Sequence, residues 1–222
     1  MPYTYNLSGS ASASNANLSA IAVPAVNRYL YPVGLDLTAG SQTGAGYRHT
    51  GNKVIQFVPL KVATTITVDR IGLMIVDNNS CVDTWTYSLG LYTNNSTDNY
   101  PNTLITDFGD ITYEAGVTPT GVQQITINQT LQANTQYWIA IGIYVNATND
   151  TSNARTPIMY QLQGDFAIYR KRGISAVNSG ALGMAWGHSL GSFDGNLPSS
   201  VSYASNSASL PTCIRTPLRR SA

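Results

Sequence analysis

The chain has 222 residues, enough for one large domain, and charged residues make up only 10% of it, against roughly 25% in an average soluble domain. Its net charge is +1, which excludes the strongly basic surface typical of a nucleic-acid-binding protein. Glu114 is the only glutamate, so the polarity comes from Asn, Thr, Ser and Gln, a composition that favours strands and turns over exposed helices. No apolar run approaches the length of a membrane-spanning helix, so we expect no membrane insertion.

The first segment differs from the rest of the chain. Residues 1–25 are rich in Ser, Ala and Asn and carry few charges, so they cannot drive a packed core and are predicted to form a flexible or partner-ordered arm. The start lacks the basic and apolar regions of a signal peptide. In a reducing cytosol Cys81 and Cys213 would hold free thiols. One folded domain is expected over residues 26–222.

From residue 26 onward, strand-like runs alternate with turn residues, and no stretch shows the apolar period of a helix. Strong candidates cover residues 26–32, 53–60, 65–76, 84–92, 103–108, 122–128 and 136–145. Weaker candidates cover residues 158–162, 166–169, 182–186 and 200–203. Many short strands separated by Gly, Pro and Asn turns predict an all-β fold, and we favour a jelly-roll-like β-sandwich.

Period-2 alternation predicts which side chains face the core. Ile71, Leu73 and Ile75 share one face of their strand. The same pattern groups Trp85, Tyr87, Leu89 and Leu91 on a buried face. Gly90 then lies on the opposite face, where its missing side chain allows close packing or a bend. Residues 136–145 are apolar on both faces, which predicts a central strand that is covered on both sides.

The sequence GHSLG at residues 187–191 matches the G-x-S-x-G motif of the nucleophile elbow in α/β-hydrolases. That chemistry requires Ser189 on a strand-to-helix turn, with an acid and a histidine later in the chain. No histidine follows Ser189 and no helical pattern follows Gly191. We interpret the motif as a glycine-rich turn after a strand at 182–186 and predict that the protein is not an enzyme.

Other catalytic or metal-binding patterns are also incomplete. Residues 46–53 lack the Gly-Lys-Ser/Thr order of a phosphate-binding loop. Asp107, Asp110 and Glu114 are a candidate carboxylate pair for glycoside hydrolysis, but Asp also favours turns. Residues 77–83 are rich in oxygen ligands without the spacing of an EF-hand. We therefore expect no catalytic residue, no metal site and no cofactor.

Aromatic residues raise the question of sugar binding, because exposed rings stack on pyranose faces. The aromatic residues in predicted loops are Tyr47, Tyr100 and Phe193. Asn94 and Asn95 lie in the polar connector between the strand-like runs at 84–92 and 103–108. These five residues are the candidate ligand-binding residues, although core or subunit contacts are the competing explanation for the aromatic ones.

Several short motifs resemble, in their order, a jelly-roll module of tailed-bacteriophage virion proteins. Such modules occur in capsid decoration or cement proteins, head fibres and tail-fibre tips. The resemblance covers residues 26–216, with Asn102 in place of the family's usual glycine. The motifs are DRIG at 69–72, LGLY at 89–92, PNTLI at 101–105, DFG at 107–109, TL at 130–131 and YWIA at 137–140, with Leu-Pro at 197–198 and 210–211.

The resemblance implies a non-enzymatic virion structural protein, assembled in the host cytoplasm, displayed on the particle surface and often homotrimeric. The arm would dock on a capsid or tail structural protein, and its apolar residues Tyr3, Tyr5, Leu7 and Leu18 are the candidate contacts. The alternative is a glycan-binding adhesin of the tail that recognises a host-surface glycan. The basic end at residues 215–220 is expected to be a polar tail or a subunit contact.

Overall fold

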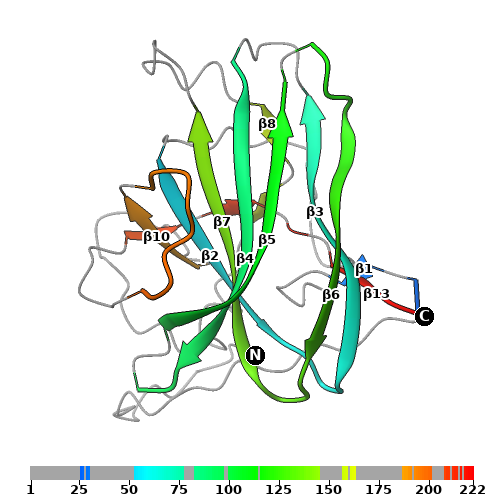
Figure 1. Cartoon of the computed structure of the whole chain (residues 1–222), viewed down its shortest axis with the longest axis vertical. Helices are drawn as coiled ribbons and strands as arrows, with labels where there is room; N and C mark the ends of the chain where they lie inside the picture. Colours follow the sequence, from blue (N-terminus) through cyan, green and yellow to red (C-terminus); the bar gives the residue numbers. More distant parts are fainter. Residues whose placement is uncertain are drawn as a thin grey trace, which may run out of the picture.

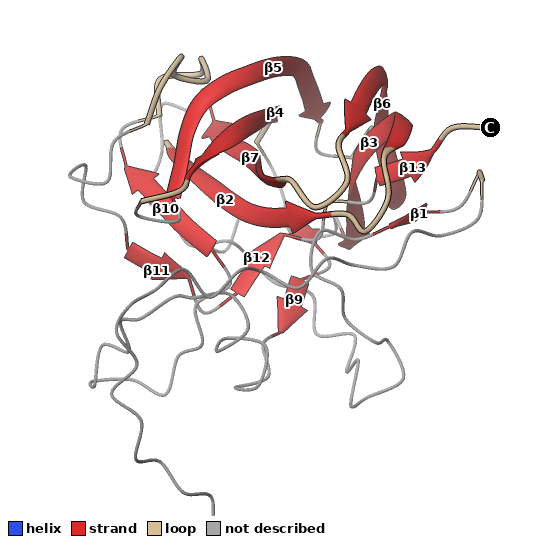
Figure 2. Cartoon of the chain, turned by 90° about the horizontal axis from the view of Figure 1, so that it is seen from below, coloured by secondary structure: helices blue, strands red, loops and turns tan. Residues whose placement is uncertain are grey.

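The computed structural model describes residues 26–27, 29–30, 53–77, 83–97, 100–114, 116–145, 157–159, 161–163, 187–191, 193–201, 208–210, 212–214, 216 and 218–222. The predicted arm at 1–25 and the predicted strands at 166–169 and 182–186 lie outside these residues. The described ranges contain strands, turns and bridges but no helix (Figures 1 and 2). They therefore contain no helix that is long and apolar enough to cross a membrane.

The longer strands, of eight to fourteen residues each, all belong to the two main sheets. They are β2 (Val54–Lys61), β3 (Ile66–Asp77), β4 (Trp85–Asn95), β5 (Tyr100–Tyr113), β6 (Gly121–Leu131) and β7 (Gln136–Val145). The shorter strands are β1 (Tyr29–Leu30), β8 (Ile158–Met159), β9 (Gln161–Gln163), β10 (Gly187–Gly191), β11 (Ala208–Leu210), β12 (Thr212–Ile214) and β13 (Leu218–Arg220).

Two antiparallel sheets pack on each other, so the predicted all-β sandwich is confirmed. One sheet has six strands in the order β11-β10-β2-β7-β4-β5, and the other has the order β1-β13-β3-β6 with β8 also paired to β3. Figure 2 shows β2, β7, β4 and β5 on one side and β13, β3 and β6 on the other. A small separate sheet joins β12 to β9. The narrower prediction, a jelly roll with an N-terminal arm, stays a prediction.

The pairing of the strands is nested. β4 pairs with the next strand, β5, while β3 pairs with β6 and β2 with β7. The first strand of the described chain, β1, pairs with the last, β13. Each pair therefore encloses the pairs between its two strands. Two of these pairs belong to each main sheet, so strands that are far apart in the sequence become neighbours.

The main core lies between the sheets, where strand alternation predicts it. Val68 and Leu131, from β3 and β6, face Val58 and Leu60 of β2 and the apolar face of β7. Burying such side chains stabilises the fold by about 1.5–3 kcal/mol each. The predicted core faces are confirmed for Ile71, Leu73, Ile75, Trp85, Tyr87, Leu89 and Leu91, all of which are buried.

The six-stranded sheet is also covered on its other face, as the apolar pattern of β7 predicts. Ile139, Ile141 and Ile143 face the other sheet, while Trp138 and Ala140 belong to a second cluster on the outer face. That cluster also contains Ile55, Phe57, Tyr92, Tyr100, Phe193, Leu197 and Val201. We call it the outer cluster, and the cluster between the sheets the inner cluster.

Two predictions about element boundaries are wrong. Residues 187–191 form strand β10, not a turn, because β10 pairs with β2 on one side and β11 on the other. The strand predicted at 103–108 is longer, Tyr100–Tyr113. It extends through Gly109, which has φ +92°, and register shifts between β4 and β5 accommodate it. A β-bulge of this kind bends a strand without ending it, which period-2 counting does not detect.

Candidate functional site

The candidate site is the tip of the β4–β5 hairpin, where the predicted ligand-binding residues Asn94 and Asn95 lie. They are half-buried and pair in register with Pro101 and Tyr100, so they belong to strand β4 and not to the loop. The Asn95 Oδ1 atom accepts a hydrogen bond of 2.9 Å from the backbone N–H of Thr97. This contact is the local turn that Asn side chains commonly form with the backbone two residues on.

Asn94 connects the hairpin tip to the central strand β7. Its Oδ1 atom accepts a hydrogen bond of 2.7 Å from Trp138 Nε1 and one of 3.2 Å from Gln136 Nε2. A buried indole N–H requires an acceptor, and Asn94 supplies it. The side-chain carbonyl group of Asn94 therefore holds β4 against β7. Asn94 thus has a structural role in the fold.

A second pair of residues holds the hairpin at a register shift. The hydroxyl group of Thr93 accepts a hydrogen bond of 3.0 Å from the backbone N–H of Thr103. Thr93 lies between Tyr92 and Asn94, where the pairing of β4 with β5 is irregular. The threonine hydroxyl thus supplies a hydrogen bond between β4 and β5 where their pairing is irregular.

Tyr100 and Phe193, the candidates for an exposed ring in a loop, are buried, which agrees with the competing explanation of core contacts. Their exposed fractions are 1% and 3%. Tyr100 begins strand β5 and packs in the outer cluster. The ring of Phe193 lies over Gly142, so closely that a Cβ atom added to this glycine would lie 2.5 Å from Phe193 Cζ. Neither ring is available to stack on a sugar in this arrangement.

The remaining predicted site residues lie outside the described residues. These are Tyr47, in the glycine-rich segment, and the arm residues Tyr3, Tyr5, Leu7 and Leu18. Of the residues predicted to bind ligand, the structure thus brings Asn94, Asn95 and Tyr100 to one end of the sandwich. Phe193 lies in the same cluster as Tyr100, in a segment more than ninety residues later.

Sequence reasoning missed the segment that covers the outer cluster, residues 193–201, which we call the covering segment. Its backbone is bonded at both ends: Phe193 N–H donates to Lys53 O at 2.8 Å, and Val201 N–H donates to Asn102 O at 2.7 Å. Between them, Ser199 O accepts a hydrogen bond of 2.9 Å from Leu104 N–H. The segment is therefore fixed to β5 and to the residue directly before β2.

Side chains of β4 complete the attachment of the covering segment. The hydroxyl group of Tyr92 donates a hydrogen bond of 2.7 Å to Pro198 O, and its ring packs edge-on against Phe57. Burial, with a smaller contribution from the negative charge of Asp107, raises the pKa of Tyr92, so this group stays a hydrogen-bond donor. Leu197 fills the space above Gly90, where a Cβ atom would lie 2.5 Å from Leu197 Cδ1.

The sequence feature that could have revealed a covering segment is the presence of glycines in strands that are otherwise apolar. Gly90 and Gly142 are neighbours of buried strand residues, and a strand glycine often marks a place where another part of the chain approaches closely. The prediction that Gly90 allows close packing is confirmed. The identity of the approaching segment required the structure, since residues 193–199 have no strand pattern and 200–203 was only a weaker strand candidate.

The acidic residues suggested as a catalytic carboxylate pair lie on strand β5 and directly after its end. Asp107, Asp110 and Glu114 are all exposed. The Asp107 Oδ1 atom accepts a hydrogen bond of 2.9 Å from Gly109 N–H, across the bulge. The described residues include no group of His, Cys, Asp and Glu side chains that could hold a metal ion. Asp107 therefore has a structural role, because its side chain stabilises the bulge in β5.

Ser189 of the GHSLG motif lies within strand β10, opposite Gln56 of β2 and Ala208 of β11. A nucleophile elbow places its serine on a sharp turn between a strand and a helix. Here the backbone is paired on both sides. The motif therefore lacks the geometry that gives it chemical meaning in hydrolases.

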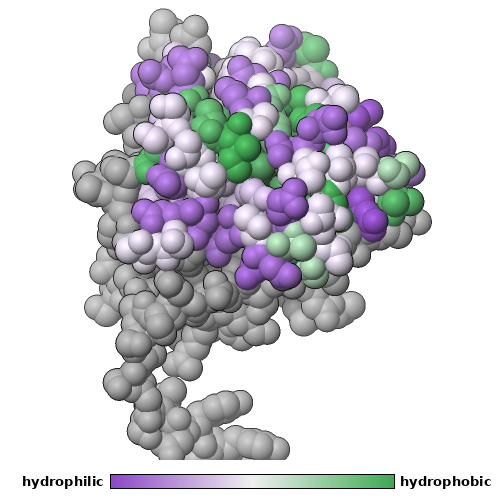
Figure 3. Space-filling model, turned by 60° about the horizontal axis from the view of Figure 1, so that its bottom comes forward, coloured by the Kyte–Doolittle hydropathy of each residue, from purple (hydrophilic) through white to green (hydrophobic). Residues whose placement is uncertain are grey.

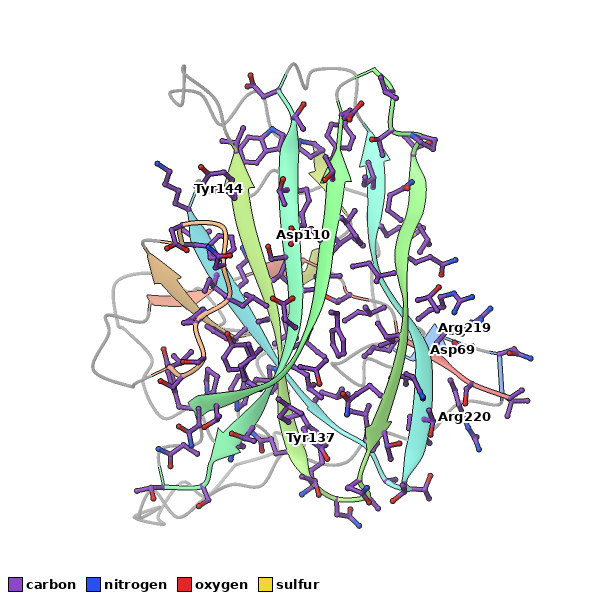
Figure 4. All side chains as sticks on the ribbon, in the orientation of Figure 1. Asp69, Asp110, Tyr137, Tyr144, Arg219 and Arg220 are labelled. Carbon is purple, nitrogen blue, oxygen red and sulfur yellow. The ribbon has the colours of Figure 1, made fainter. Side chains whose placement is uncertain are left out.

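The basic end of the chain is part of the five-stranded sheet. The guanidinium group of Arg219 donates to both carboxylate oxygens of Asp69, from Nε at 2.9 Å and from Nη2 at 2.7 Å (Figure 4). This double hydrogen bond lowers the pKa of Asp69 below its ordinary value. Arg219 thus joins β13 to β3, which explains a basic residue here without a nucleic-acid partner.

Comparisons with known proteins give no identification. No protein-family model matches the chain, and no curated protein matches it. The functional argument therefore rests on the residues and the fold.

Proposed function

We propose that this chain is a non-enzymatic structural protein displayed on the surface of a tailed-bacteriophage particle. In this proposal residues 1–25 dock on a capsid or tail structural protein, and the β-sandwich projects outward. The proposal follows from the resemblance of the short motifs to virion modules. Neither comparison provides a homologue, so the main structural support for the proposal is the nested pairing of the strands.

The nested pairs β1–β13, β2–β7, β3–β6 and β4–β5 correspond to one long antiparallel ribbon rolled into two sheets. Rolling explains why β13 lies between β1 and β3, and why β7 lies between β2 and β4. A double-sheet jelly roll of eight strands has this kind of arrangement, and viral capsid and lectin domains use it. The strand order therefore supports the jelly-roll fold that the motifs imply.

The packing also supports a structural role over a binding role. Both faces of the six-stranded sheet are covered, one by the other sheet and one by the covering segment. On the face seen in Figure 3, hydrophilic and intermediate residues predominate among those described, and hydrophobic ones form small areas. A rigid domain with a mostly uncharged polar surface suits exposure on a particle.

The experiment compares particles that carry the full-length chain with particles made when residues 1–20 are deleted. Mass spectrometry of purified particles should detect the full-length chain and not the deletion variant. The purified deletion variant should unfold at the same denaturant concentration as the full chain. Particles without the full-length chain would refute the display proposal. Equal incorporation of both chains would refute docking through the arm.

The alternative proposal, a glycan-binding adhesin, has lost part of its basis. Tyr100 and Phe193 are buried, and the side-chain carbonyl group of Asn94 accepts a hydrogen bond from β7. Asn95 and Tyr47 remain as candidates for contact with a glycan. A glycan array with the parent chain and Asn95→Ala and Tyr47→Ala variants tests it, and binding that both changes abolish would favour the adhesin.

A further inference from the structure

The covering segment contains the only aspartate of the chain that is followed by glycine, Asp194, and no asparagine of the chain is followed by glycine. An Asp-Gly link is prone to cyclise, because no side chain shields the backbone nitrogen that follows the aspartate. Asp194 is exposed and Gly195 is half-buried. A Cβ atom added to Gly195 would meet no atom within 4 Å, so the space beside this link is open.

The carboxylate of Asp194 is turned back along the backbone toward the residues that follow it. Its Oδ1 atom accepts a hydrogen bond of 3.1 Å from the backbone N–H of Asn196. Aspartate side chains form such turns with the backbone two residues on. Gly195, between them, has φ +107°, a conformation that glycine adopts without steric cost. The turn therefore folds the carboxyl group of Asp194 over the nitrogen atom of Gly195.

Asp107 provides a comparison within the same chain. It is also exposed, and its Oδ1 atom accepts a hydrogen bond of 2.9 Å from the backbone N–H of Gly109, again two residues later. However, Asp107 is followed by Phe108, whose side chain packs against the inner cluster. It also lies within strand β5, whereas Asp194 lies outside the named strands. The two aspartates thus share exposure and a turn, and differ at the nitrogen atom that a cyclisation would use.

We propose that Asp194–Gly195 is a modification site at which the chain converts its own backbone into an isoaspartyl link. The nitrogen atom of Gly195 attacks Cγ of the protonated Asp194 carboxyl group and forms a C–N bond. The proton of this nitrogen leaves with the carboxyl hydroxyl group as water. The N–H of Asn196 donates to the oxygen atom on which negative charge develops. The step needs no oxidant, reductant or second protein.

Water then opens the succinimide ring that the first step forms. Attack of water at the former side-chain carbonyl carbon restores aspartate. Attack at the former main-chain carbonyl carbon of residue 194 leaves the peptide bond on Cγ, so the backbone runs through the former side chain. The backbone is then longer by one carbon atom, a bond of about 1.5 Å. The main-chain carboxylate that is released replaces the side-chain one, so the net charge does not change.

The longer link lies between the two closest contacts of the covering segment with the sheet. On one side, a Cβ atom added to Gly142 would lie 2.5 Å from Phe193 Cζ. On the other side, a Cβ atom added to Gly90 would lie 2.5 Å from Leu197 Cδ1. Contacts this close leave little room for a shift, and the conversion also removes the turn at Asp194. The converted covering segment should therefore detach from the outer cluster more often.

The first test incubates the folded full chain in neutral buffer and maps isoaspartate by peptide mass spectrometry, with a protease that cleaves before aspartate but not before isoaspartate. Isoaspartate should accumulate at Asp194 at least about tenfold faster than at Asp107. Asp194→Glu should form none at this position, because the larger ring closes far more slowly. Asp194→Asn should form the same succinimide with loss of ammonia, and should yield both aspartate and isoaspartate on hydrolysis.

The second test measures what the conversion does to the covering segment. The amides of Leu104 and Val201 donate the hydrogen bonds that join this segment to β5. Their hydrogen exchange in the converted chain should be about fivefold faster or more, while exchange in β7 stays the same. Asp194→Glu, incubated in parallel and matching the parent in circular dichroism, should keep its exchange rates.

Two outcomes of the first test would overturn the modification site. One is a folded chain without isoaspartate at Asp194 over the time in which a free peptide with the sequence of residues 190–199 converts. The other is accumulation at Asp107 as fast as at Asp194, which would remove the role of the glycine. Unchanged exchange of Leu104 and Val201 in the converted chain would overturn the effect on the covering segment.

Discussion

The two faces of the six-stranded sheet are both buried, but by different means. On the inner face, long strands of one sheet cover long strands of the other, and the inner cluster contains side chains from β2, β3, β4, β5, β6, β7 and β13. On the outer face, the covering segment at 193–201 lies over the cluster without being a named strand. The inner face thus belongs to the sandwich itself, and the outer face depends on an added attachment.

The difference has a consequence for stability. Residues of the inner cluster can be exposed only by opening the sandwich, whereas the outer cluster can be exposed by detaching the covering segment alone. Proteins open in such partial units, at free energies below that of global unfolding. Side chains at the outer face should therefore contribute less to global stability than equally buried ones at the inner face.

The largest effect is expected at the inner face. Leu89 is fully buried in β4, and Leu89→Ala should lower the free energy of unfolding by about 3–5 kcal/mol, because the rigid sheets cannot close the cavity. Urea denaturation followed by circular dichroism measures this change. A loss below about 1.5 kcal/mol would mean that the two sheets move together to fill the space.

A smaller effect is expected at the outer face. Phe193→Ala should cost about 2–3 kcal/mol, below the usual 3–5 kcal/mol for a buried phenylalanine, because detachment of the covering segment limits the loss. Acrylamide quenching of tryptophan fluorescence should increase, since Trp138 lies in the same cluster. A loss as large as that of Leu89→Ala would remove the distinction between the two faces.

Gly142→Ala sharpens this prediction by disturbing the same contact from the other side. The new Cβ atom would lie 2.5 Å from Phe193 Cζ, so the ring must move, at a cost of about 1–3 kcal/mol. In the double variant Gly142→Ala, Phe193→Ala the added methyl group has room. The two costs should therefore fail to add, and strict additivity would show that Phe193 does not lie over Gly142 in solution.

Tyr92→Phe removes one attachment of the covering segment and keeps the ring. The lost hydrogen bond to Pro198 O should cost about 0.5–1.5 kcal/mol. Urea denaturation of the variant measures the cost, and the carbonyl group left behind should raise the rate of hydrogen exchange in residues 197–201. An unchanged exchange rate there would indicate that the backbone bonds of the segment suffice to hold it.

The smallest effect is expected at the Asp69–Arg219 pair, whose two side chains are partly exposed on the five-stranded sheet. Asp69→Asn should cost about 0.5–1 kcal/mol near neutral pH. Because the pKa of Asp69 is lowered in the folded chain, the stabilisation is present above the ordinary value of 3.8 and is lost as the pH falls through the lowered pKa.

Unfolding free energies of the parent and Asp69→Asn, measured at about pH 7 and about pH 3, test this sign. The difference between the two proteins should shrink at the lower pH. A difference that grows at low pH would contradict the role of the ionised carboxylate.

The same comparison shows what the sequence could predict. The inner face follows from alternation within single strands, so Trp85, Tyr87, Leu89 and Leu91 were placed correctly. Strand β7 was placed correctly too, because a run that is apolar on both faces has one physical meaning in a sandwich. These inferences need no knowledge of distant partners.

The outer face depends on contacts between segments far apart in the sequence. Tyr100 and Phe193 resembled loop aromatics because the residues next to them in the sequence are polar. In the structure both are buried in the outer cluster. The strand β10 was also missed, since its glycines resemble a turn until β2 and β11 pair with it. The burial of these two aromatic residues weakens the sugar-binding alternative and leaves the proposal of a virion structural protein unchanged.

Hydrogen exchange of the backbone amides at the ends of the covering segment tests this account most directly. The amides of Phe193, Leu104 and Val201 donate to Lys53, Ser199 and Asn102 across the outer face. We expect all three to be protected in the native chain, more weakly than the amides of β7. Exchange at the rate of an unstructured peptide, while β7 stays protected, would show an open outer face and would restore the sugar-binding alternative.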